Sequence, residues 1–137
     1  MASKKKSWVE KRNCGKAPHI KVIDKVFAGI PAGSKLLISS PLEIDAFVRD
    51  IHKGAQINPA EMRQTLAKRH KADATCPVST GIFLRIVIEA ALEEYNQGMP
   101  LSEVAPFWRI VDPGSALAKK ISIGSEEFQT IKKLAEE

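Results

Sequence analysis

Residues 79–98, STGIFLRIVIEAALEEYNQG, carry an apolar pattern that repeats with the period of an α-helix. One predicted face consists of Ile82, Phe83, Ile86, Val87, Ala90 and Ala91. Leu84 and Ile88 extend the apolar surface further round, which is typical of a mostly buried helix. The sequence therefore predicts a long, mostly buried helix in this 137-residue chain.

The ends of this helix have their own signals. We expect it to begin near Ser79 or Thr80 and to end at about Asn96, before Gly98. We expect only its first turn and its acidic residues to face water. These acidic residues are Glu89, Glu93 and Glu94.

Two shorter helices are predicted before the long one. Ser40 and Glu43 form a capping-box pattern, with a proline at the first helical position, and predict a helix over 41–53. Asn58 and Pro59 repeat this arrangement and begin a second helix, which ends in the basic stretch AKRHK.

The flanking segments predict strands and turns. KLLIS (35–39) suits a strand after the turn PAGS (31–34), whereas IKVIDKVFAGIP (20–31) fits either a strand or a short helix. FWRIV (107–111) is aromatic and β-branched, so we expect a strand that the turn DPGS joins to ALAKKIS in a hairpin. Ser125 is expected to cap a closing helix.

This order of elements predicts an α+β fold, a winged helix-turn-helix-like domain over residues 31–137. Residues 1–25 hold eight Lys/Arg against two acids, a net charge of +6, and we expect residues 1–30 to form a flexible basic arm. No apolar run suits a membrane span or a secretory signal, which favours a cytoplasmic protein without membrane contact. Two distant cysteines predict neither a metal site nor a cofactor.

The distribution of charge favours duplex DNA as a partner. Residues 49–71 hold six basic and two acidic groups, a net charge of +4, so phosphate contacts are expected from Arg63, Lys68, Arg69 and Lys71. Short side chains at the start of the long helix predict a phosphate seat at Ser79, Thr80 and Gly81. The alternatives are a solvated surface helix and an ordinary helix cap.

Several segments of residues 42–136 resemble the C-terminal domain of the alkylguanine-DNA alkyltransferases and their non-catalytic alkyltransferase-like relatives. IHKGAQINPAEMRQTLAKRHKA (51–72) is similar to the first motif helix and the step before it, and PFWRIV (106–111) to the Pro-Cys-His-Arg-Val-Val signature. DPGSALAKK resembles the wing of that family, and EEFQTIKKLAEE its closing helix. The resemblance implies a DNA-binding fold with a pocket at Pro106, Phe107, Trp108 and Arg109.

Catalysis in that family needs a cysteine thiolate, which a histidine and a glutamate activate. Phe107 stands at the cysteine position and Trp108 at the histidine position, whereas Pro106 and Arg109 match the signature. The family's phosphate-pushing tyrosine is replaced by Pro59, and its intercalating arginine by the Ser-Thr-Gly stretch at 79–81. The resemblance therefore implies a non-enzymatic DNA-repair protein that binds alkylated or damaged duplexes.

Two other interpretations remain open. A degenerate domain could bind a protein or a small ligand through its apolar pocket, without DNA. Cys76 precedes a proline and a helix start, which can lower a thiol pKa, so it could also act as a replacement nucleophile. On a strand, Phe107 and Trp108 would point to opposite faces, and Arg109 is expected to bond backbone carbonyls.

Overall fold

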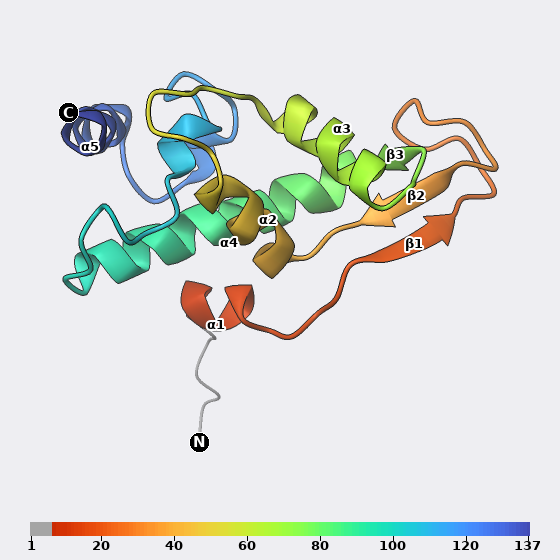
Figure 1. The fold of residues 1–137 in the computed structure, drawn as a ribbon, viewed down its shortest axis with the longest axis horizontal. Helices are drawn as coiled ribbons and strands as arrows, with labels where there is room; N and C mark the ends of the chain where they lie inside the picture. The colour runs from red at the N-terminus through yellow and green to blue at the C-terminus, as the bar shows by residue number, and fades with distance from the viewer. Residues whose placement is uncertain (1–6) are drawn as a thin grey trace.

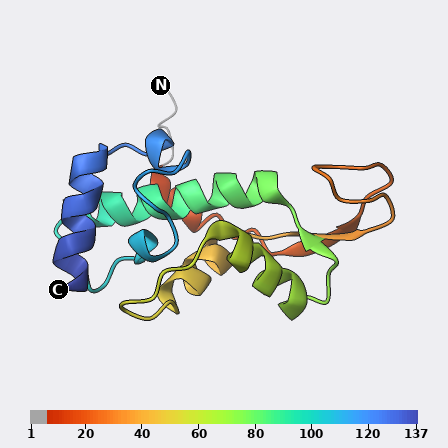
Figure 2. The ribbon, with the colours of Figure 1, turned by 90° about the horizontal axis from the view of Figure 1, so that it is seen from above.

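The computed structural model describes residues 7–137, which form helices and a small sheet, an α+β arrangement as predicted (Figure 1). In chain order the elements are α1 (Trp8–Arg12), β1 (His19–Val22), β2 (Lys35–Ile38), α2 (Pro41–Arg49), α3 (Pro59–Arg69), β3 (Ala74–Thr75), α4 (Pro77–Asn96), the 3-10 helices η1 (Phe107–Arg109) and η2 (Ala118–Lys120), and α5 (Ser125–Glu136). Both ribbon views place the sheet at one end of the molecule and α5 at the other, with α4 running between them (Figures 1 and 2). None of the described helices is both long and apolar enough to cross a bilayer.

Helix α4 is the long buried helix that the sequence predicts, but it begins earlier and presents a different face. Pro77 occupies its first turn, and Cys76 is the N-cap, whose carbonyl accepts the Thr80 hydroxyl at 2.6 Å. The buried residues are Thr80, Leu84, Val87, Ile88, Glu89, Ala90, Ala91 and Leu92. Ile82, expected in the core, is 56% exposed, so the expectation for the N-terminal end of the apolar face is wrong.

The core packs the buried side of α4 against α2, η1 and α5. Its fully buried large side chains include Ile44, Leu84, Trp108 and Phe128. Phe107 contacts Trp108 and Phe128 edge-to-face, with ring centroids 5.1 and 5.4 Å apart. Such aromatic pairs add to the stability gained from buried area. The region predicted as the pocket of the domain is therefore part of its core.

The hairpin predicted over residues 107–122 is wrong. FWRIV begins as the 3-10 helix η1, and ALAKKIS contains the 3-10 helix η2. A strand would send Phe107 and Trp108 to opposite faces, whereas successive side chains of a 3-10 turn diverge by about 120°. Both rings can then enter one core, and both are 1% exposed. The DPGS turn is present, with the Ser115 N–H donating to the Asp112 carbonyl at 3.0 Å.

The two capped helices form as predicted, with small differences. The Ser40 hydroxyl accepts the Glu43 N–H at 3.1 Å, and Asn58 Oδ1 accepts the Glu61 N–H at 2.9 Å. Glu43 does not complete the capping box, because its carboxylate accepts the Ser39 hydroxyl and lies 2.6 Å from His70 Nε2. Helix α2 ends at Arg49 rather than at residue 53.

The sheet joins the N-terminal segment to the rest of the chain. Strand β1 pairs antiparallel with β2, from His19 opposite Ile38 to Val22 opposite Lys35, which settles the choice left open for this segment. The segment between α3 and α4 contains β3, which runs parallel to β2. The expected boundary at residue 30 lies between two paired strands, so residues 7–30 are not a separate arm. The remaining lysines of that arm, Lys4, Lys5 and Lys6, lie outside the described residues.

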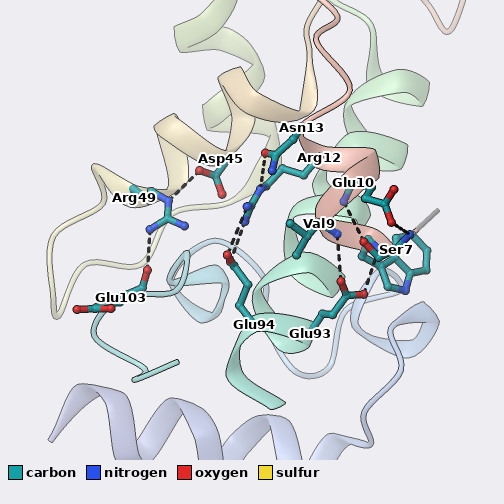
Figure 3. A network of polar contacts seen from close by, with 11 residues as sticks. Ser7, Val9, Glu10, Arg12, Asn13, Asp45, Arg49, Glu93, Glu94 and Glu103 are labelled. Carbon is teal, nitrogen blue, oxygen red and sulfur yellow. Dashed lines mark hydrogen bonds and ion pairs between the residues drawn. The ribbon is translucent and has the colours of Figure 1, made fainter. Parts of the chain in front are cut away.

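Helix α1 docks on the acidic end of α4 (Figure 3). The carboxylate of Glu93 accepts the backbone N–H groups of Trp8 and Val9 at 3.1 and 3.4 Å. Arg12 donates to both carboxylate oxygens of Glu94, with the shorter bond 2.7 Å long. Glu93 and Glu94 therefore bind α1 instead of facing water, and no local pattern in the sequence predicts these contacts. Glu89 is buried as well and accepts the Ser122 N–H and hydroxyl.

We expect Arg12→Met to lower the free energy of unfolding by about 1.5–3 kcal/mol, because it leaves the Glu94 carboxylate without its charged partner. The Arg12 and Glu94 side chains are only 10% and 14% exposed, so water replaces the lost bonds poorly. Urea unfolding at neutral pH measures the change. Lys16→Met is the matched control, since Lys16 is exposed. Equal stability of the two variants would contradict a stabilising role for α1 docking.

Candidate functional site

A groove of about 470 Å³ lies where the starts of α3 and α4 meet the residues around η2. We call it the α3–α4 groove. Residues that line it include Pro59, Arg63, Thr80, Gly81, Arg85 and Lys120. Two further lining residues, Val78 and Ile82, are each 56% exposed.

The α3–α4 groove is positively charged. Arg63 comes from α3, Arg85 from α4 and Lys120 from η2, and none of the described lining residues is Asp or Glu. Neither Arg63 nor Lys120 forms an ion pair with another described residue. Cations that share a cleft raise the local concentration of anions, because the low-dielectric walls focus their field.

The predicted phosphate seat differs from its expected form. Thr80 and Gly81 line the groove, but the residues at 79–81 follow the N-cap instead of forming it. The Ser79 N–H donates to Cys76 Sγ at 3.5 Å, and the Thr80 N–H to the Cys76 carbonyl at 3.1 Å. These two backbone donors are therefore already engaged. The Ser79 hydroxyl is buried without a partner among the described residues.

The four basic residues predicted on the second helix are not gathered in one place. Arg63 lines the α3–α4 groove and also, with Lys68, a neighbouring cleft of about 500 Å³. Arg69 lies over the Phe47 ring, with Cζ 5.3 Å from the centroid. Lys71 is exposed in a left-handed conformation at φ 55°. Of this set, only Arg63 lines the groove.

The predicted pocket residues take structural positions. Pro106, Phe107 and Trp108 are buried. Arg109 donates through Nη1 to the Ile51 carbonyl at 2.7 Å and through Nη2 to Glu136 at 3.0 Å, in agreement with its expected bonding to a backbone carbonyl.

A cleft of about 680 Å³ lies beside the groove. It is lined by Ile110 and Val111, which directly follow the residues 106–109 that were predicted to form a pocket. Its apolar lining includes Ile57, Pro59, Ile110, Val111 and Leu117. Pro59 and Leu117 line both this cleft and the α3–α4 groove, so the two hollows adjoin. We call it the side cleft.

Cys76 is not placed as a nucleophile would be. It is 5% exposed, and its Sγ accepts the Ser79 N–H in its role as the N-cap of α4. Thiolate chemistry needs an accessible sulfur, and this sulfur is not accessible.

The sequence did not predict that Arg85 and Lys120 line a groove. It also did not predict that Val78 and Ile82 are exposed. Arg85 had a signal of its own, as the one charged residue in the apolar run from 82 to 88. Lys120 had none, because its place depends on the path of residues 110–121 over the core.

Comparisons with protein-family models, curated proteins and solved structures find no match for this chain. No group of three or more His, Cys, Asp or Glu in residues 7–137 could hold a metal ion.

Glu136 completes a cluster that ties α5 to the α2–α3 loop. Burial acts to raise the pKa of its carboxyl, but the hydrogen bond from Arg109, the Gly54 N–H and the guanidinium charge outweigh burial and hold the pKa below its ordinary value of 4.5. The Gly54 N–H donates to Glu136 Oε1 at 3.1 Å. The ionised carboxylate therefore stabilises the fold. This contribution is complete above the ordinary pKa and is lost as the pH falls through the lowered one.

We expect Glu136→Gln to be less stable than the wild type by about 1–2 kcal/mol near neutral pH, because it loses charge-assisted bonds to Arg109. The difference should shrink as the pH falls from 4.5 through the lowered pKa of Glu136, because the carboxylate of the folded wild type becomes protonated only there. Urea unfolding over a pH series measures both effects. Glu137→Gln serves as the control for an exposed carboxylate at the same helix end. A difference that stays constant across the series would contradict the assigned role.

Proposed function

We propose that the α3–α4 groove binds duplex DNA and that the protein acts by recognition rather than by catalysis, as a winged-helix-like domain of alkyltransferase-like type. The observation that carries the proposal is the gathering of Arg63, Arg85 and Lys120 from three separate elements around one groove that has no described acidic lining. Such a groove suits a polyanion, whose phosphates supply most of the affinity of DNA-binding proteins.

The arrangement of α3 and α4 also supports duplex DNA. In helix-turn-helix proteins, the N-terminal part of the second helix enters the major groove while the first helix crosses the backbone. Here Val78 and Ile82 from the first turns of α4 line the groove and are exposed, and Arg63 of α3 lines the same groove. The expected hairpin wing is absent, and in this proposal the η2 region, with Lys120, takes the position of the wing.

The proposal excludes the alkyl-transfer reaction of the family that the sequence resembles. Phe107 and Trp108 stand at the positions of the reactive cysteine and its histidine, and both rings are buried. We therefore propose binding to alkylated or otherwise damaged duplexes, with any repair carried out by other proteins. The two cysteines are free thiols, which agrees with the cytoplasm as the proposed compartment.

A steep dependence of duplex affinity on salt is expected, and Arg63→Gln and Lys120→Gln should each lower the slope of log K against log salt by about one. Fluorescence anisotropy of a labelled duplex, from about 50 to about 200 mM salt, measures the slope. Lys133→Gln is the matched control, because Lys133 is exposed on α5 and does not line the groove. Absence of binding to any duplex at low salt would refute the proposal.

We further expect the wild type to bind a duplex with one alkylated guanine about tenfold more tightly than the matched unmodified duplex. The same anisotropy titration, run with the two duplexes in parallel, measures the ratio. Equal affinities would leave general DNA binding in place and remove damage recognition.

A second candidate function is binding of a small ligand or a protein segment in the side cleft. Its volume of about 680 Å³ and its apolar wall at Ile57, Ile110 and Val111 favour it. The duplex titration separates the two candidates. This function is favoured if no duplex binds.

A further inference from the structure

Val78 and Ile82 are the only apolar side chains of α4 that stand largely in water among those described. Each is 56% exposed, whereas Leu84, Val87 and Ile88 further along the helix are at most 1% exposed. The two residues are four positions apart, so they lie on one face of the helix, and both line the α3–α4 groove. Exposed apolar residues gathered in a groove indicate a binding surface more often than singly scattered ones do.

The charges around Val78 and Ile82 limit the kind of ligand that can bind over them. Arg85 follows Ile82 by three residues and therefore lies near it on the helix surface, while Arg63 and Lys120 line the same groove. An occupant must therefore offer both negative charge and apolar atoms. Duplex DNA has this chemistry, with phosphates along both edges of a groove and base edges, including thymine methyl groups, on its floor.

We infer that Val78 and Ile82 are the side chains that meet the base pairs, while Arg63 and Lys120 hold the flanking phosphates. This inference rests on the proposed function and assigns separate roles to the apolar and the charged residues of the groove. Apolar contacts release no counterions, whereas phosphate contacts do. The apolar pair should therefore set affinity independently of salt, and the two cations should set the salt slope.

The test compares Val78→Ala, Ile82→Ala and the double variant with the wild type in the duplex titration at several salt concentrations. We expect the double variant to bind about 5- to 30-fold more weakly at every salt concentration, because apolar contact area is lost. Its salt slope should equal that of the wild type. Leu134→Ala is the matched control, since Leu134 is 55% exposed on α5 and does not line the groove. It should bind as the wild type does.

The outcomes separate this inference from the proposed function. If the wild type binds no duplex, the proposed function fails and this inference fails with it. If the wild type binds and the double variant binds equally well, only this inference is overturned. A lower salt slope in the double variant would also overturn it, because the apolar pair would then act by positioning the cations.

Anionic vesicles of phosphatidylcholine and phosphatidylserine provide a second probe, since a lipid surface also combines negative charge with apolar atoms. We expect the double variant and the wild type to bind these vesicles equally. Vesicle binding that is lost in the double variant, with duplex binding unchanged, would overturn the inference.

Urea unfolding of each variant shows that a loss of affinity does not reflect a loss of fold. Both side chains are exposed, so little change in stability is expected.

Discussion

The packing of this chain is organised around the burial of α4. A 20-residue helix with apolar residues on most of its circumference is stable in water only when other elements cover it. Helix α2, the aromatic pair of η1 and α5 cover its apolar side chains, and α1 covers its acidic end through Glu93 and Glu94. The first turns of α4 are the part left open, and there the candidate groove forms.

The cluster of Arg109 and Glu136 fixes the side of the molecule opposite the sheet. Arg109 bonds the Ile51 carbonyl through its side chain and accepts the Ile57 N–H at its own carbonyl, at 2.9 Å. It thereby holds η1 against the α2–α3 loop, while Glu136 anchors the end of α5 to the same loop. The chain that leaves this cluster forms the wall of the side cleft and then reaches the groove at Leu117 and Lys120. Arg109 thus holds the segment that leads to the groove, but Arg109 itself does not line the groove.

The groove combines two physical properties that single elements of this chain do not provide. Helix α3 supplies a cation, α4 supplies one cation and an exposed apolar pair, and η2 supplies a further cation. Unpaired cations at a groove attract phosphates over a distance of about one Debye length, whereas apolar side chains act only on contact. A ligand would therefore be drawn in by charge and then selected by fit. The buried core joins the three elements that carry these side chains, through Leu66 of α3, Leu84 of α4 and Ala118 of η2.

Elements whose signals are local could be predicted from the residues alone. Ser40 and Asn58, each with a proline after it, predicted where α2 and α3 begin, because a helix cap depends on residues within one turn. The apolar period predicted α4, and KLLIS predicted β2. The remaining features follow from long-range packing. Contacts between residues far apart in the chain hold α1 on α4 and pair β1 and β3 with β2. Such contacts also explain why Phe107 begins a 3-10 helix and not the expected strand. The same is true of the groove, because its cations come from three elements whose meeting is set by packing and not by any local pattern.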